Sequence, residues 1–217
     1  MLKLTIRLFL INSIAVLLLC SCATNFVADY SPQAISNPIY KNRYFSDPST
    51  DYVYKANLSV YGNDLSGIFI AKKINHTIHR VVFTTEFGNK LLDFEISESH
   101  FKVNYLIEDL DRKILINILR EDFRLLLKED YTVTAEYGSA TENVFKSEGK
   151  NLDNYLFVNK VNNKLMRLIN ASKRKEKINI AFTSENDIFA DRIIIQHENI
   201  KLRIELNFFE KQPKQTP

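Results

Sequence analysis

A two-residue alternation of apolar and polar side chains recurs along this chain and constrains its fold more than any other feature. Apolar residues occupy every second position in 52–60, in 90–97 and in 200–208. Because successive side chains of a strand point to opposite faces, each segment predicts a strand with one buried and one solvated face. Short polar turns separate these segments, so the pattern indicates antiparallel hairpins.

The pattern changes period once, between Asp109 and Leu127. Apolar residues recur there at three- and four-residue spacing, which predicts an amphipathic helix with Asp109 or Asp111 as its N-cap. Strand signals precede this segment from Tyr52 and resume from Tyr131 to Phe208. We therefore expect a mainly β protein with helices (α+β), in which one large antiparallel sheet of about ten to eleven strands is roofed by one main helix. Such a sheet must twist and curl, which would leave room for an apolar hollow under the helix.

The N-terminal residues 1–21 read as a lipoprotein signal peptide. Lys3 and Arg7 precede an apolar run that is shorter than the ~20 residues needed to span a bilayer. Cys22 has Leu19 three positions before it and the small Ser21 just before it, as a lipoprotein-processing peptidase requires. We predict that Cys22 is the lipid anchor and carries a diacylglycerol and an N-acyl chain, with no other cofactor. The alternative is an ordinary signal peptide with incidental cysteines.

Three further segments follow from this reading. X-Pro pairs disfavour helix in residues 22–50, so the lipidated N-terminus continues as a mobile or surface-hugging tether. Residues 51–210 form the β domain, and 211–217 form a polar tail. No acidic cluster follows Cys22, which favours a protein on the outer membrane that faces the periplasm.

Charge and cysteine content exclude several classes of protein. Without Lys3 and Arg7, 27 of the 29 basic residues remain against 26 acidic ones, which is too balanced for a nucleic-acid binder. No cysteine follows Cys22, so the exported domain has no disulfide and depends on its core. About 170 residues are enough for such a core, and we expect a monomer.

Residues with catalytic or metal-binding chemistry are scattered. His76 and His79 would point to opposite faces of a strand and more simply lie in a turn, and His100 and His197 read as lone turn residues, so no metal site is expected. Asp93 and Glu95 share a strand face that is most simply the solvated one. No nucleophile elbow or phosphate loop is present, so we expect no catalytic residues and no enzyme.

A basic run, Lys173-Arg174-Lys175 with Lys177, leaves two readings open. It could touch anionic lipid headgroups. A solvated hairpin turn is the simpler interpretation.

The order of parts between Leu65 and Ile96 resembles the LolA/LolB family of lipoprotein localisation factors, and LolB-type outer-membrane receptors in particular. Leu65-Ser66-Gly67 opens a strand, Arg80–Thr85 is an apolar strand led by arginine, Glu86-Phe87-Gly88 is a short loop, and Leu91–Ile96 returns. Ile200–Leu206 is similar to the closing strand of the family. The family member compared ends its last strand near a tryptophan, where this chain has Phe208 or Phe209, and little between Tyr131 and Phe182 matches.

The resemblance implies a half-open barrel that binds acyl chains and a function as a lipoprotein acceptor. A LolA-like periplasmic carrier would deliver lipoprotein cargo, which the protein would insert into the outer membrane. Phe87 with Gly88 would form a membrane-insertion loop. The acyl-binding cavity would be lined by Val81, Phe83, Leu92, Phe94, Ile96, Leu202, Ile204 and Leu206.

A second reading stays open beside the acceptor. The same fold could serve as a structural or adaptor lipoprotein that binds a protein partner, with a filled core and no ligand.

Overall fold

The computed structural model describes residues 26–149, 151–172, 175–185 and 188–209. The predicted signal peptide, Cys22 and the tail at 211–217 lie outside these residues. The described chain forms one 13-stranded sheet, a second sheet of two strands and one main helix, so the predicted mainly β fold is confirmed. No helix among the described residues is long and apolar enough to cross a membrane.

All neighbouring strands of the large sheet are antiparallel, and the sheet is not closed into a barrel. Its spatial order is β1-β9-β10-β11-β12-β13-β14-β15-β3-β4-β5-β6-β7. The N-terminal group of strands comprises β1 (Ser31–Gln33), β3 (Tyr52–Val60), β4 (Asn63–Lys73), β5 (His79–Thr84), β6 (Lys90–Ile96) and β7 (Phe101–Leu106). The C-terminal group comprises β9 (Ala135–Gly138), β10 (Glu142–Ser147), β11 (Asp153–Asn159), β12 (Leu165–Ser172), β13 (Lys175–Thr183), β14 (Arg192–His197) and β15 (Leu202–Phe208).

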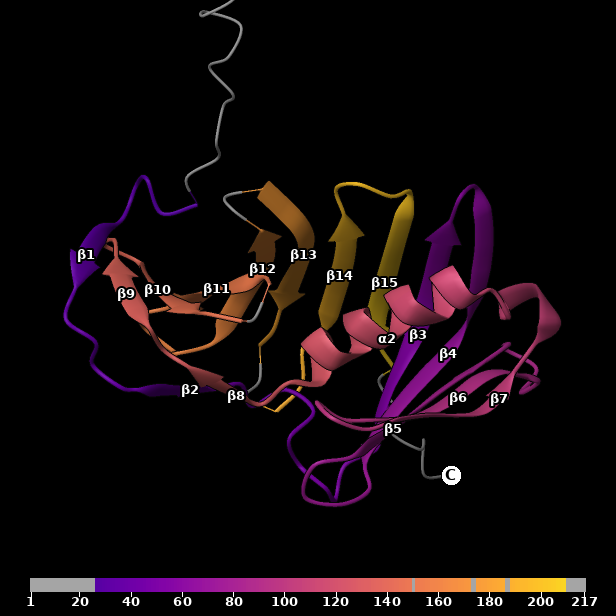
Figure 1. Ribbon diagram of the computed structural model, residues 1–217. Coiled ribbons are helices and arrows are strands. Elements are labelled where there is room, and N and C mark those ends of the chain that lie inside the picture. The colour runs from indigo at the N-terminus through magenta and orange to yellow at the C-terminus, as the bar shows by residue number, and fades with distance from the viewer. Residues whose placement is uncertain (1–25, 150, 173–174, 186–187, 210–217) are drawn as a thin grey trace, which may run out of the picture.

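The helix α2 (Lys113–Leu127) lies across the concave face of the sheet, in front of β14, β15, β3 and β4 (Figure 1). A short 3-10 turn, η1 (Glu108–Leu110), precedes it, and the N-cap is Arg112, without a side-chain hydrogen bond. The predicted N-cap at Asp109 or Asp111 is therefore wrong, because the chain turns once more before the helix begins. Its buried face carries Leu115, Leu119, Asp122, Phe123, Leu126 and Leu127.

The predicted strand at 131–137 is divided between two sheets. β8 (Asp130–Thr132) pairs with β2 (Ile39–Lys41), whereas β9 joins the large sheet next to β10. The chain leaves one sheet and enters the other at Val133 and Thr134. Period-2 alternation could not reveal this break, because each half of the segment is itself a strand.

The predicted tether at 22–50 is part of the folded domain from Phe26 onward. β1 pairs with β9, and β2 pairs with β8. Tyr44 and Phe45 are buried in the main core, and the Phe45 ring lies 4.9 Å from that of Tyr52. The X-Pro pairs disfavour helix here, as predicted. The segment instead forms two short strands and contributes a buried aromatic pair to the core.

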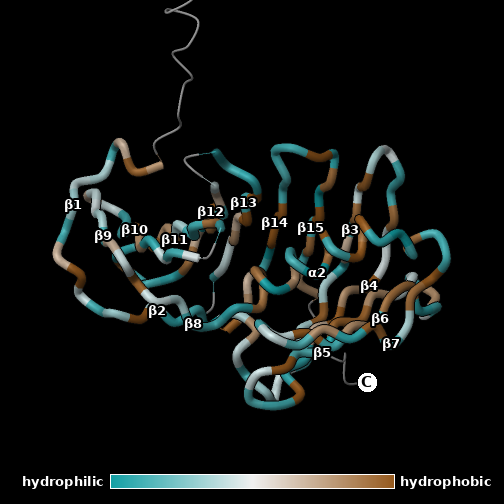
Figure 2. The backbone as a smooth tube through the Cα atoms, viewed as in Figure 1, coloured by the Kyte–Doolittle hydropathy of each residue, from teal (hydrophilic) through white to brown (hydrophobic). Residues whose placement is uncertain are grey.

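The two faces of the sheet have separate apolar clusters. The main core lies between the concave face and α2 and extends over most of the sheet. Figure 2 shows hydrophobic residues alternating along the strands and hydrophilic residues at several turns, as the sequence pattern predicts. On the opposite face, the N-terminal segment covers a smaller cluster of Val144, Phe157, Ile169 and Ala171.

Candidate functional site

Phe87 lies at the tip of the hairpin between β5 and β6, and its side chain is 93% exposed. The Gly88 amide donates to the Thr85 carbonyl over 3.0 Å, and the Thr85 amide donates to the Asn89 carbonyl over 2.8 Å. Gly88 has φ +86°, the left-handed conformation that a three-residue hairpin loop needs at its last position. The turn is thus held by its own backbone hydrogen bonds, to which the exposed Phe87 side chain does not contribute.

The residues predicted to line an acyl cavity all lie in the main core. Each is at most 3% exposed, and each belongs to β5, β6 or β15. Four of them, Phe83, Leu92, Ile204 and Leu206, line a space of about 10 Å³ together with Leu119 and Phe123 of α2. This volume holds one water molecule at most. The predicted residues are therefore close together in one core, whereas their acyl-binding role stays a prediction.

Aromatic rings fill the space between the sheet and the helix. The Phe123 ring of α2 lies 5.5 Å from that of Phe69 and 6.4 Å from that of Phe94. Phe94 also makes an edge contact with Phe101, at 5.1 Å between ring centroids. An acyl chain can enter here only if α2 moves away from the sheet, because packed rings leave no channel.

An open cleft lies beyond this packed region, at the C-terminal end of α2. Its volume is about 560 Å³, which is within the range of small-molecule sites. The lining is mixed: Ile96, Leu127 and Ile178 lie beside Glu98, Arg124, Lys128 and Glu129. The sequence analysis missed this cleft, since the lining comes from β5, β6, α2, β11, β12 and β13 and from the loops between them.

Charged pairs also join elements that are distant in sequence. Nε2 of His197, the last residue of β14, lies 2.8 Å from a carboxylate oxygen of Asp122 on α2. The Asp122 side chain is fully buried, and this burial raises the pKa of Asp122. The reading of His197 as a lone turn residue is thus wrong. The pair ties the roof helix to the sheet.

Asp93 corrects the expectation of a solvated face on β6. Its side chain is 1% exposed because Arg80 and Lys90 cover it, at 2.7 Å each, and Asn104 donates to it at 3.4 Å. The Arg80 guanidinium, then Lys90 and Asn104, hold the pKa of Asp93 well below its usual range. Glu95 stays partly exposed on the same face. A carboxylate held by two cations is a structural group rather than a catalytic acid.

The histidines form no metal site in the described part of the chain. His76 is exposed in the β4–β5 turn, whereas His79 begins β5 and lies buried with Nε2 2.8 Å from the Phe45 carbonyl oxygen. The predicted turn position is therefore correct for His76 only. Burial lowers the pKa of His79. No group of three or more metal-ligating side chains occurs among the described residues.

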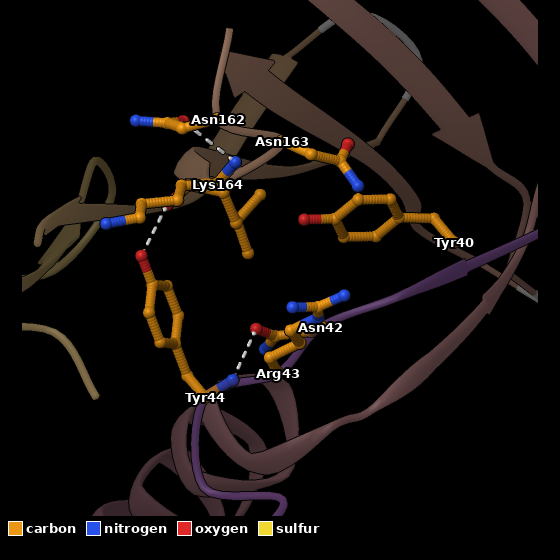
Figure 3. Close-up of a pocket in the computed structure, with 8 residues that line it drawn as sticks. Tyr40, Asn42, Arg43, Tyr44, Asn162, Asn163 and Lys164 are labelled. Atoms are coloured by element: carbon orange, nitrogen blue, oxygen red, sulfur yellow. Dashed lines mark hydrogen bonds between the residues drawn. The ribbon is translucent and has the colours of Figure 1, made fainter. Parts of the chain in front are cut away.

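A small polar pocket of about 50 Å³ lies where the N-terminal segment passes the β11–β12 turn (Figure 3). Tyr44 closes one side, and its hydroxyl donates to the Leu165 carbonyl at 3.3 Å. Asn42 accepts a hydrogen bond from the Tyr44 amide over 3.1 Å. Tyr44 and Asn42 thus serve the packing of the N-terminal segment.

Comparisons with known proteins give structural likenesses only. No family model and no curated sequence matches the chain. A LolA superfamily protein from Nitrosomonas europaea is similar with a TM-score of 0.47 and 9% identity, over 80% of this chain and 90% of that one.

Two further solved structures are similar at a lower level. A DUF1329 family protein from Desulfovibrio piger gives a TM-score of 0.42 and 12% identity, over 76% of this chain and 85% of that one. A domain assigned to outer membrane lipoprotein-sorting proteins, from Vibrio parahaemolyticus, gives 0.42 and 6%, over 74% and 83%. At TM-scores below 0.5, none of these likenesses supports a conclusion about function.

Proposed function

We propose that the protein is a lipid-anchored acceptor of lipoproteins at the outer membrane, comparable to LolB. Acyl chains on Cys22 would hold it in the inner leaflet, where it faces the periplasm. It would receive the acyl chains of a lipoprotein from a LolA-like carrier and release them into the membrane. No covalent bond changes, and the driving force is a difference in apolar burial of ~0.8 kcal/mol per CH₂.

The observation that carries this proposal is the exposed Phe87 on a rigid hairpin of an open, apolar, helix-covered sheet. A large apolar side chain that is 93% exposed gains nothing from water, and the turn does not need it for folding. Contact with acyl chains or with the bilayer would bury it and gain roughly 1.5–3 kcal/mol. That energy can bias delivery without anchoring the protein.

The decisive experiment replaces Phe87 with glutamate. Phe87→Glu should leave the thermal unfolding temperature and Cys22 acylation unchanged, while transfer of a lipoprotein from carrier to membrane stops. Val161→Glu is a matched control, because Val161 is also 93% exposed, at the β11–β12 turn. Wild-type transfer by folded Phe87→Glu, or equal loss in both variants, would show that this hairpin does not act in transfer.

The anchor is tested separately by metabolic labelling with a fatty-acid analogue. Wild-type protein should take up the label, and Cys22→Ala should not. A label that persists in Cys22→Ala and disappears in Cys20→Ala would assign the anchor to the other cysteine.

The adaptor reading has one observation in its favour, which is the filled core. Phe83, Leu92, Ile204 and Leu206 leave only about 10 Å³ of space beneath α2, so this part of the core needs no ligand to fold. Purified domain that carries no lipid and takes up no environment-sensitive apolar dye would favour the adaptor over the acceptor.

A further inference from the structure

The N-terminal segment packs against the domain from Phe26, the first described residue. The Phe26 ring lies 5.2 Å from that of Tyr155, and the Tyr30 ring lies 5.8 Å from that of Phe157. The Tyr30 hydroxyl donates to Glu142 over 2.5 Å, and burial together with this carboxylate raises the pKa of Tyr30 to about 12. Tyr30 therefore stays protonated as a donor at neutral pH. This segment, which we call the N-terminal brace, packs on the outer face of the sheet and is not a free tether.

The brace leaves only a short connection to the predicted anchor. Four peptide steps separate Cys22 from Phe26, and a fully extended chain spans at most ~3.6 Å per residue, or about 14 Å. If Cys22 is acylated, as the proposed function requires, Phe26 must stay within that distance of the bilayer. The lipid anchor thus orients the domain as well as retaining it.

The strand order shows which end of the strands lies nearest to this connection. Tyr155, which Phe26 contacts, is near the start of β11 and pairs with Ile169 near the end of β12. The β12–β13 turn therefore lies at this edge. Because all the strands are antiparallel, the β14–β15 and β3–β4 turns lie at the same end of the strands as the β12–β13 turn. We name this row of turns the anchor edge.

Figure 1 agrees with this assignment for the central strands. The β14–β15 and β3–β4 hairpins point to the side on which the described chain begins. The twist of the sheet makes β5 and β6 run across them, so their hairpin with Phe87 points elsewhere.

The β3–β4 turn at the anchor edge has an unusual residue. Val60 pairs with Asn63, so Tyr61 and Gly62 form a two-residue turn, with φ values of +50° and +86°. Asparagine or glycine is the usual residue at the first position, because a β-carbon is strained there. The Tyr61 amide donates to the Lys201 carbonyl over 2.8 Å, which fixes the turn against β15.

Tyr61 is also 59% exposed, so its ring does not contribute enough packing to explain the strain. An aromatic ring with a polar hydroxyl is suited to the boundary between lipid headgroups and acyl chains. We infer that the anchor edge rests on the bilayer to which Cys22 is attached, with Tyr61 inserted at its surface. This inference rests on the lipid anchor of the proposed function and adds the orientation of the domain.

The absence of tryptophan from the chain allows a direct test. Tyr61→Trp introduces a single tryptophan into the full-length acylated protein, which is reconstituted into phosphatidylcholine vesicles with brominated acyl chains. A tryptophan at the membrane interface lies close to the acyl chains, so its emission should fall relative to unbrominated vesicles, because bromine quenches only at close range. Val161→Trp, at the opposite edge of the sheet, should show no quenching.

The other outcomes separate this inference from the proposed function. Equal quenching at both positions, or quenching at Val161→Trp alone, would overturn the inference. So would no quenching at Tyr61→Trp while the fatty-acid label remains on Cys22, a result that would leave a protein partner to cover Tyr61. Loss of the label itself would overturn the anchor and, with it, both proposals.

Two additional variants keep the test independent of folding and of Phe87. If Tyr61→Trp does not fold, Lys201→Trp reports on the adjacent turn of the same edge. Tyr61→Asn should fold at least as stably as wild type, since asparagine suits this turn, which would show that the aromatic side chain is not needed for folding. A failure of Phe87→Glu to block transfer would leave the quenching result at Tyr61→Trp unaffected.

Discussion

The region beneath the middle of α2 and the cleft at its C-terminal end differ in how their space is used. Packed aromatic rings reduce the first to a cavity of about 10 Å³, whereas the second is open to about 560 Å³ and is lined by apolar and charged side chains together. The sequence resemblance placed the acyl cavity in the first region. Of these two regions, only the second has room for an occupant in this conformation, and the first becomes available only when α2 moves.

The largest expected effect comes from opening the packed region. Phe123→Ala removes the ring that contacts Phe69 and Phe94 from the helix side. It should lower the free energy of unfolding by about 3–5 kcal/mol and enlarge the cavity. Denaturant unfolding measures the first effect, and uptake of an apolar dye measures the second. A loss below about 1 kcal/mol would show that this region is not tightly packed.

A smaller effect on the free energy of unfolding is expected at Asp93 of β6, on the face of the sheet opposite α2. Asp93→Asn removes the carboxylate that Arg80 and Lys90 hold, and it should cost about 1.5–3 kcal/mol at pH 7. The pKa of Asp93 is lowered in the folded state, so its stabilisation is present above the unfolded value of 3.8 and is lost as the pH falls below it. The stability difference between wild type and variant should therefore be smaller at pH 3 than at pH 7 without vanishing, because the pKa of Asp93 in the folded state lies well below its usual range. Urea unfolding at both pH values would reveal a constant difference if Asp93 were not ionised in the fold.

The smallest effect on stability is expected in the cleft. Leu152 is partly exposed and lines it, so Leu152→Trp should change the free energy of unfolding by less than about 1 kcal/mol. The larger ring should nevertheless reduce dye uptake, because it fills the open volume. Ile114→Trp is the control, since Ile114 is 72% exposed at the other end of α2. Equal uptake by both variants would place the dye outside the cleft.

Much of the fold could be predicted because strand alternation and helix periodicity are local signals. β3 was predicted with its exact bounds, and the end of α2 at Leu127 was also correct. The position of Phe87 at a hairpin tip followed from the turn residues around it. The prediction was wrong where pairing is decided by distant residues, as in the division of 131–137 between β8 and β9 and in the tether that supplies β1 and β2.

The sequence by itself determined which side chains face inward, since burial on one face of a strand follows from its two-residue period. It also determined that Cys22, with the residues before it, is the candidate anchor. Only the tertiary structure decided how fully those inward side chains occupy the core, because volume depends on how rings from α2 and the sheet fit together. It likewise decided that Asp122 meets His197 and that Tyr61 shares an edge with the N-terminal brace. These are relations between residues far apart in the chain, and no local period encodes them.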